Sequence, residues 1–207
     1  MFLEESVWIR EKLSDLALPP EAGVLNIGSS DQEFLKTQPH IEENVLAPLR
    51  ARGCVITNLD IRPARPGDYT GDITDKNLPA AIGRRFPLVI CTNLLEHVEN
   101  LETAFSNISG LAEDGGFILV TVPNHYPFHP DPVDTMFRPG PAELEAWVKR
   151  FCPAETEAAA VVEILSPRYY YFESRFPFWG YRKMIFWRRW FSRWRWKVSC
   201  VLLRRKT

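Results

Sequence analysis

The chain has 207 residues, of which 45% are hydrophobic and 25% are charged, a composition typical of a globular protein rather than a low-complexity one. A chain of this length can bury a real core, so residues 1–207 are expected to form one domain. The net charge of −1 hides an asymmetry, because residues 181–207 hold ten Lys and Arg and no acid. The rest of the chain carries 15 basic against 26 acidic side chains, so the basic tail suggests a separate contact surface.

The cysteines and the N-terminal segment indicate the cellular compartment in which the protein is expected. The four cysteines form no CxxC pair, which argues against both a zinc site and a disulfide framework. The N-terminus is charged and helical in pattern, unlike a secretory signal, and no apolar run approaches the length of a membrane-spanning helix. We therefore expect a cytoplasmic protein. Its basic tail could also contact the inner face of the membrane peripherally.

Hydrophobic periodicity predicts alternating helices and strands. The predicted helices span 2–16, 41–52, 99–111 and 141–151, and the predicted strands span 24–28, 54–60, 87–93, 117–122, 160–165 and 198–203, with a short edge strand or turn at 69–74. Gly115 and Gly116 are expected to end the third helix. Strands that are apolar on both faces and alternate with helices predict a parallel sheet in an α/β domain.

The segment AGVLNIGSSD, residues 22–31, carries the first functional signal. A buried strand that stops at Gly28 and feeds a helix places backbone N–H groups and a helix N-terminus at one point. Alone this signal is weak, but polar residues also stand at the ends of later strands. The GxGxxG pattern of nicotinamide oxidoreductases is not present here, which makes that class less favoured.

The order of motifs resembles the class I S-adenosylmethionine-dependent methyltransferases, in particular the type 11 methyltransferase-like group. The segments that carry the resemblance are VLNIGSS, VITNLDIRP, GDITD, FPLVICTNLLEHVEN and LAEDGGFILVTVPN, which cover roughly residues 20–125, and the terminal VSCVLLRRK. The resemblance implies a Rossmann-like, doubly wound, mostly parallel sheet of about seven strands with an antiparallel last strand. It also implies an N-terminal helix in 1–20, a cofactor-binding core in 21–125, and a substrate loop, aromatic basic segment and last strands in 126–207.

The same resemblance implies S-adenosylmethionine as the cofactor. The residues implied to bind it are Asn26, Gly28, Ser29, Ser30, Asp60, Ile61, Asp72, Ile73 and Asn93. Asp60 would accept hydrogen bonds from the ribose hydroxyls, and Asp72 would face the adenine amino group with Ile73 against the ring. The chain departs from the family at Asn26, where an acid is usual, and near Ser29 and Ser30, where glycines are usual. These departures bear on cofactor affinity more than on fold.

Three of these residues have a simpler structural interpretation. Asp60 suits a turn at a strand end. Asp72 could cap a helix near 76–78. Asn93 could be a helix N-cap, with Glu96 completing a capping box, and this alternative is compatible with cofactor contact.

The loop 124–140 is the expected acceptor site, because it begins at the carboxyl end of a strand. Residues proposed to bind the acceptor are His125, Tyr126, Asp131, Asp134 and Arg138. His129 is the first candidate for a general base and His97 the second, although His97 could instead be a structural histidine bonded to a backbone carbonyl. His129, Asp131 and Asp134 could hold a metal, but their spacing alone is weak support, so no metal is expected. The loop could also be a proline-stiffened surface cover.

The segment 182–197 places aromatic residues at helical spacing with arginines largely elsewhere around the helix. This pattern is typical of an interfacial membrane helix and also fits a lipid-linked acceptor. The alternative is a helix packed on the sheet with its arginines in water. No nucleic-acid partner is expected, since no recognised binding module is present.

The sequence therefore predicts an enzyme that methylates a small-molecule, sugar or lipid-linked acceptor by direct in-line transfer. The competing hypothesis is a non-catalytic methyltransferase-like scaffold that uses its basic tail to bind a partner or membrane.

Overall fold

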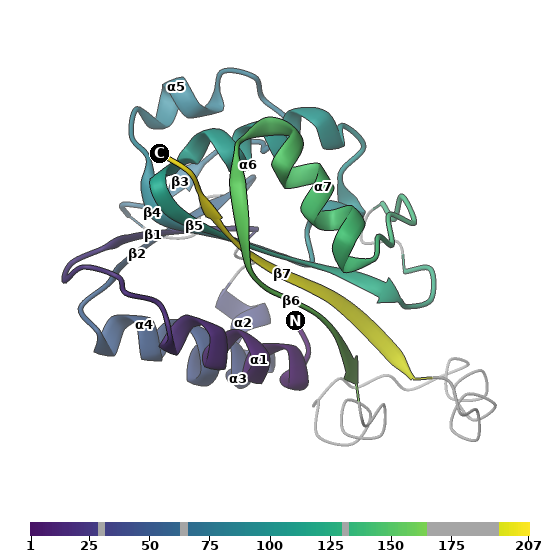
Figure 1. Cartoon of the computed structure of the whole chain (residues 1–207). Helices are drawn as coiled ribbons and strands as arrows, with labels where there is room; N and C mark the ends of the chain where they lie inside the picture. The colour runs from purple at the N-terminus through teal and green to yellow at the C-terminus, as the bar shows by residue number, and fades with distance from the viewer. Residues whose placement is uncertain (29–31, 63–65, 130–132, 165–194) are drawn as a thin grey trace.

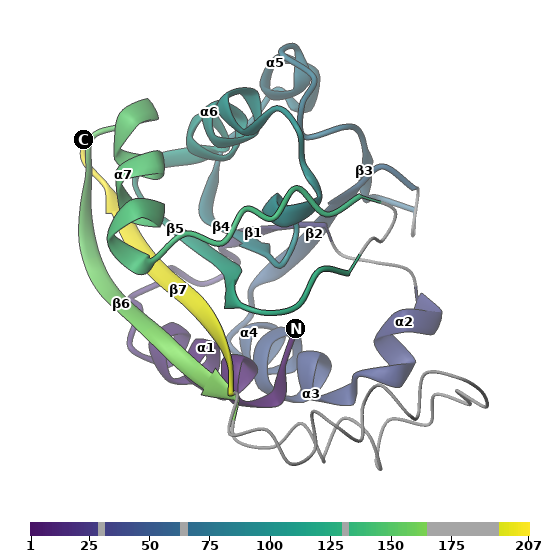
Figure 2. The same cartoon turned by 90° about the vertical axis from the view of Figure 1, so that its right-hand side faces the viewer.

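The computed structural model describes residues 1–28, 32–62, 66–129, 133–164 and 195–207. Its centre is a seven-stranded sheet with the strand order β3-β2-β1-β4-β5-β7-β6. Helices cover both faces of this sheet, which makes a three-layer α/β/α arrangement (Figures 1 and 2). The predicted doubly wound fold is confirmed.

The strands are β1 (Gly23–Ile27), β2 (Val55–Asp60), β3 (Tyr69–Thr70), β4 (Phe86–Thr92), β5 (Ala112–His125), β6 (Ala154–Ile164) and β7 (Trp196–Arg205). Neighbouring strands from β3 to β5 pair in parallel. The last strand, β7, runs antiparallel to β5 on one side and to β6 on the other, as expected.

Strand β7 extends two residues beyond each end of the predicted 198–203, and two other strands begin at least five residues before their predicted starts. Strand β5 begins at Ala112 and contains Gly115 and Gly116, so these glycines lie in a strand and do not simply end the preceding helix. Strand β6 begins at Ala154, six residues before the predicted start. Its first half, AETEAAA, has low intrinsic strand preference, and pairing along β7 determines its conformation instead.

The helices fall on the two faces of the sheet. One face carries α1 (Leu3–Ser14), α3 (Pro39–Ile41), the π-turn η1 (Glu42–Leu46) and α4 (Ala47–Ala51), with the short α2 (Gln32–Thr37) beside them (Figure 2). The other face carries α5 (Leu78–Ile82), α6 (Leu101–Leu111) and α7 (Pro141–Phe151). The segments α3, η1 and α4 follow one another without a break, so the predicted helix 41–52 exists but contains a π-turn.

Each face of the sheet has its own apolar core. Leu25 and Ile27 of β1 pack with fully buried residues of α6, while Val24 points to the opposite face and packs with Ile9 of α1. Because β1 is buried on both faces, the neighbouring residues Val24 and Leu25 are both apolar although they point to opposite faces. The central strands are thereby held on both sides, and this fixes the positions of their carboxyl ends.

The parallel strands end at one edge of the sheet. Gly28 follows β1, Ile61 follows β2, and Asn93 follows β4. Gly28 has a φ of +72°, and a Cβ atom there would lie 3.1 Å from the Leu94 side chain, so the turn after β1 requires glycine. Gly28, Ile61 and Asn93, three of the residues expected to bind the cofactor, therefore lie at the carboxyl edge.

Candidate functional site

The end of β2 provides two of the predicted cofactor residues, Asp60 and Ile61. Asp60 is half-buried, and its Oδ1 accepts a hydrogen bond of 3.0 Å from the backbone N–H of Arg62. The next side chain, Ile61, is 69% exposed. A carboxylate and an exposed apolar side chain thus lie together at the sheet edge, an arrangement suited to a ribose and a flat ring.

Asp72 lies in the turn that follows β3. Its Oδ1 accepts hydrogen bonds of 2.8 Å from both the backbone N–H and the hydroxyl of Thr74. Helix α5 begins only at Leu78, and its N-cap is Asn77, so Asp72 does not cap it. Ile73 is buried in the core, and its carbonyl accepts a hydrogen bond from Asn107. Adenine contact by Asp72 and Ile73 stays a prediction.

Asn26 joins β1 to β2 through side chains. Its Nδ2 donates to Asn58 Oδ1 at 3.0 Å, and Asn58 in turn donates to the carboxylate of Asp68 at 3.1 Å. Asn26 is therefore part of a polar chain across two strands, at the position where the resemblance implies an acid. Ser29 and Ser30 lie outside the described residues, and their predicted cofactor contact stays a prediction.

Asn93 has the most unusual geometry at the sheet edge. Its φ is +48°, in the left-handed region, and its backbone N–H donates to the carbonyl of Thr121 at 2.9 Å. Its side chain donates to Glu5 Oε1 at 2.8 Å. The Oδ1 atom is buried and has no hydrogen-bond partner among the described residues. The alternative in which Asn93 is a helix N-cap is not observed, because its side chain bonds to Glu5 and the helical turn that follows has Leu94 as its N-cap.

Glu5 is a site residue that sequence reasoning missed. It comes from α1, is completely buried, and accepts hydrogen bonds from Asn93 and from the hydroxyl of Thr121. Its other oxygen accepts from the backbone N–H of Phe2 at 2.9 Å. A signal was present in the sequence, because Glu5 continues the buried stripe of Ile9 and Leu13 at a spacing of four residues. Thus α1 is docked onto the ends of β4 and β5 by an acid.

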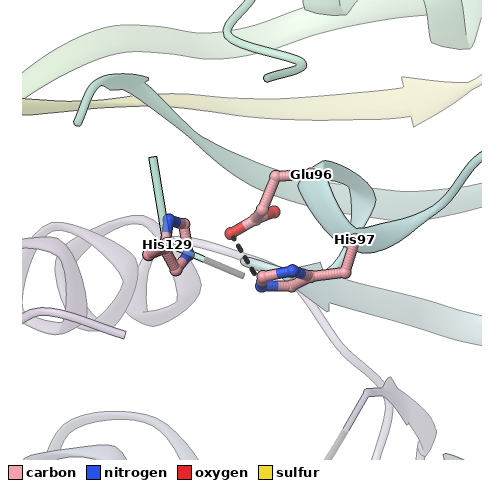
Figure 3. Close-up of side chains that lie close together, drawn as sticks. All are labelled: Glu96, His97 and His129. Carbon is pink, nitrogen blue, oxygen red and sulfur yellow. Dashed lines mark ion pairs between the residues drawn. The ribbon is translucent and has the colours of Figure 1, made fainter. Parts of the chain in front are cut away.

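Glu96 lies in the 3-10 turn η2 (Leu95–His97) and is only 1% exposed. Burial raises the pKa of Glu96 to about 8, and the negative charge of Glu5 adds to the rise. Within the described part of the chain, its Oε2 has no hydrogen-bond partner. The predicted capping role is not observed, since the residue faces inward beside two histidines (Figure 3).

The two histidines proposed as bases lie against Glu96. His97 Nε2 is 3.8 Å from Glu96 Oε1, and the rings of His97 and His129 have their centroids 5.1 Å apart (Figure 3). His97 Nδ1 is 2.5 Å from the carbonyl of Val133, which matches the structural alternative for this residue. His129 is half-buried, and burial lowers its pKa. The structure brings the two histidines together, and their catalytic roles stay predictions.

Asp134 and Arg138 form a buried ion pair within the loop. Asp134 Oδ2 accepts from Arg138 Nη2 at 2.6 Å, and the carboxylate also accepts from the backbone N–H groups of His129 and Met136. Burial alone would raise the pKa of Asp134, but these hydrogen bonds lower it to about 2. With its side chain fully buried, Asp134 orients the loop, and its contact with an acceptor stays a prediction.

Arg138 retains one buried donor. Its Nη1 donates to the carbonyl of Phe137 and its Nη2 pairs with Asp134, while its Nε is buried and has no partner in the residues that the structure describes. The guanidinium is therefore held in one orientation with a further N–H available. This arrangement suits an anionic group on an acceptor.

Aromatic rings line the start of the loop. Tyr126 lies edge-on to His129, with centroids 4.8 Å apart, and also contacts Phe2 and Trp196. His125 is exposed at the end of β5. Asp131 and residues 182–194 of the predicted basic helix lie outside the described residues. No helix in the described part of the chain is long and apolar enough to cross a membrane.

The comparisons with known proteins agree with this arrangement. A family model described as a methyltransferase domain matches residues 7–200. A candidate sarcosine dimethylglycine methyltransferase from Galdieria sulphuraria has a similar structure, with a TM-score of 0.57 at 12% identity over 99% of this chain and 86% of that one. A comparison with curated proteins found no match.

Two further similar structures contain a cofactor or its product. NodS, an N-methyltransferase from Bradyrhizobium japonicum solved with S-adenosyl-L-homocysteine, has a TM-score of 0.55 at 12% identity over 99% of this chain and 86% of its own. Phosphoethanolamine N-methyltransferase 2 from Haemonchus contortus, solved with S-adenosyl-L-methionine, has a TM-score of 0.57 at 12% identity over 98% of this chain and 52% of its own. At such identities the likeness is one of fold. The chain belongs to the methyltransferase domain family, with the fold of the class I S-adenosylmethionine-dependent methyltransferases.

Proposed function

We propose that this chain is an enzyme that transfers the methyl group of S-adenosylmethionine to a small-molecule, sugar or lipid-linked acceptor. One observation supports the proposal most directly. Gly28, Asp60 and Asn93 lie together at the carboxyl edge of the sheet, where α/β folds bind ligands. The family match and the similar structures solved with the cofactor point to the same chemistry.

The residues at this edge fit the cofactor. The carboxylate of Asp60 has acceptors for a ribose diol, and Ile61 offers an exposed apolar surface beside it. Asn93 Oδ1, buried and without a partner in the described segments, would accept a hydrogen bond from the ammonium group of the amino-acid portion. A buried polar atom left unsatisfied is costly, so a ligand donor at this point would be stabilising.

The bound cofactor supplies a methyl group on a positively charged sulfur, which an acceptor atom can attack directly. The protein would contribute mainly by holding the acceptor in line with that methyl group. A base is needed only for a weakly nucleophilic acceptor such as a hydroxyl. His129 is the first candidate for this base and His97 the second. The lowered pKa of His129 favours the neutral imidazole that can take up a proton.

The loop after β5 supports an acceptor with an anionic group. Arg138 is held in place by Asp134, and its buried Nε lacks a partner within the described ranges. Tyr126 and His125 stand at the entrance of the same loop. A carboxylate or phosphate on the acceptor would pair with the guanidinium, while the aromatic ring would cover an apolar or sugar portion.

Calorimetric titration of the purified chain with S-adenosylmethionine tests the proposal. We expect micromolar binding that is at least tenfold weaker in Asp60→Ala, because one carboxylate supplies both ribose contacts. Glu113→Ala is the matched control, since this exposed acid lies in β5 near its start, away from the carboxyl edge. The absence of binding to the unmodified chain would refute the enzyme proposal and favour the non-catalytic scaffold.

A further inference from the structure

We propose that Glu96, His97 and His129 form a binding site for a divalent transition-metal ion. Each of the three offers one ligand atom, and these atoms all lie within 4.8 Å of one another. Figure 3 shows the side chains converging from two segments, the turn after β4 and the loop after β5. The turn and the loop are joined where the backbone and hydroxyl of Thr135 both donate to the carbonyl of Glu96.

Both histidines are oriented as metal ligands usually are. His97 Nδ1 lies 2.5 Å from the Val133 carbonyl, and His129 Nδ1 lies 3.2 Å from the Pro127 carbonyl and 3.1 Å from Asp134 Oδ2. These carbonyl and carboxylate partners accept hydrogen bonds, which favours a hydrogen on Nδ1 and the lone pair on Nε2 in both rings. Arg138 Nη2 is also 3.5 Å from His129 Nδ1, but its shorter bond, of 2.6 Å, goes to Asp134 Oδ2. A ligating histidine typically donates its other N–H to a carbonyl or carboxylate in this way, which holds the ring and raises its basicity.

Glu96 provides an independent indication of a cation. The residue is 1% exposed, and its Oε2 has no hydrogen-bond partner in the portion of the chain that the structure describes. A buried carboxylate oxygen without a partner is unfavourable. The nearby Arg138 directs its Nη2 to Asp134 instead. Since Glu96 Oε1 lies 3.8 Å from His97 Nε2, a metal ion held by both carboxylate oxygens would satisfy Oε2 as well.

The ligand set selects the kind of metal. Two imidazole nitrogens and one carboxylate suit Zn²⁺, Fe²⁺, Mn²⁺ or Co²⁺ better than Mg²⁺ or Ca²⁺, which prefer oxygen ligands. In a tetrahedral site with bonds of about 2.0–2.1 Å, ligand atoms lie about 3.4 Å apart. The distance of 3.8 Å between His97 Nε2 and Glu96 Oε1 is close to that value, so small side-chain movements would close the site.

Three protein ligands leave at least one coordination position open, as in catalytic metal sites. If the proposed function holds, that position would take an oxygen of the acceptor, and the metal would polarise it before methyl transfer. The histidines would then act on the acceptor through the metal and not as free bases. This set differs from the combination of His129, Asp131 and Asp134 that the sequence suggests, because Asp134 supports His129 from behind.

The first test is metal binding by the untagged full-length chain after chelator treatment. Titration with Co²⁺, followed by its visible absorbance, should show one site per chain, and Zn²⁺ should displace the Co²⁺ signal. Glu96→Gln and His129→Asn should each weaken binding by at least tenfold. Glu113→Gln is the matched control, because this exposed acid lies near the start of β5, outside the cluster, and should not change the affinity.

The outcomes separate this proposal from the proposed function. No Co²⁺ binding by the unmodified chain, or unchanged affinity in both ligand variants, would overturn the metal site. Calorimetry with S-adenosylmethionine on the same preparations tests the enzyme proposal independently, since Asp60 is not a metal ligand. Circular dichroism and thermal unfolding identify any variant that has lost its fold. Two ligand variants are used so that one remains informative if the other does not fold.

Discussion

Asn93 shows how a single residue can combine strain with a buried polar site. A left-handed backbone costs roughly 1–2 kcal/mol for most residues, and Asn tolerates it better than others. The Asn93 conformation is held by the backbone bond to Thr121 and by the side-chain bond to Glu5. Such strain is concentrated at functional sites, where surrounding contacts over-determine the geometry. The observed strain therefore agrees with a binding role for the end of β4.

His40 is a buried residue whose titration should affect stability. It is 7% exposed, and its Nε2 lies 3.0 Å from the Met1 carbonyl. Burial lowers the pKa of His40, and the charge of the N-terminus adds to this, while the Met1 bond and the charges of Glu5 and Glu43 oppose it. The unfolded chain therefore binds this proton at a higher pH than the folded chain does.

The sign of the pH effect follows from that difference. As the pH falls below about 6.5, the unfolded state takes up the proton first, so the free energy of unfolding decreases until the folded pKa is passed. His40→Gln should remove this component, and its stability should fall less steeply between pH 7 and pH 5. Urea unfolding at several pH values measures both slopes, and equal slopes would contradict the prediction.

The site was only partly predictable at the level of residues. Gly28, Asp60 and Asn93 could be found because strand ends are visible as changes from apolar to polar sequence. The burial of Glu96 could not be predicted, since it depends on contacts far away in the chain, and for Glu5 the only signal was its place on the apolar stripe of α1. From its local sequence, Glu96 resembled a capping residue. Only the three-dimensional structure shows that its side chain packs beside His97 and His129.

For helices and strands, the sequence predicted their presence better than it predicted where each one begins and ends. Apolar runs identified every central strand, because β1, β4 and β5 are buried on both faces. The glycine pair at 115–116 suggested a stop, but backbone pairing continues β5 through it. The first half of β6 was missed for the same reason, since cross-strand pairing with β7 overrides weak local preference.

The docking of α1 gives a prediction at this scale. Glu5→Ala would leave Asn93, Thr121 and the Phe2 N–H without their acceptor, and each buried unsatisfied group costs about 1–3 kcal/mol. Allowing for relaxation, we expect a loss of about 2–4 kcal/mol in the free energy of unfolding, together with weaker S-adenosylmethionine binding because Asn93 is released.

Glu11→Ala is the matched control, because Glu11 lies on the exposed side of the same helix and should change stability by less than about 0.5 kcal/mol. Urea unfolding measures both variants. If Glu5→Ala were as stable as Glu11→Ala, the contact between α1 and the sheet ends would not contribute as described.

At the scale of the whole molecule, charge is unevenly distributed along the chain. The ten basic residues of 181–207 follow a body with a balance of −11. Most of 182–197 lies outside the described residues, and at its end Arg195 pairs with Glu163 at 2.8 Å. We propose that this basic aromatic segment binds anionic membrane surfaces, in keeping with a lipid-linked acceptor.

Co-sedimentation with vesicles tests this surface. Binding to vesicles that contain anionic lipid should exceed binding to neutral vesicles and should decrease as salt is raised. Each basic residue near such a surface contributes about 1 kcal/mol, so replacing Arg188, Arg189 and Arg193 with Gln should weaken binding roughly 100-fold. Equal binding to neutral and anionic vesicles would contradict the proposal.

The position of β7 has a consequence for how the protein is made. The final strand does not lie at the edge of the sheet but between β5 and β6, and β6 has no other strand neighbour in the described part of the chain. At about 5–20 residues per second, roughly 4–14 s separate the synthesis of the end of β5 from that of the start of β7. Throughout that interval a nascent chain would carry the free side of β5 as an open template for wrong pairing. Folding of this half of the sheet must therefore wait until residues 196–205 have been synthesised, and a chaperone that covers exposed strand edges would act in that interval.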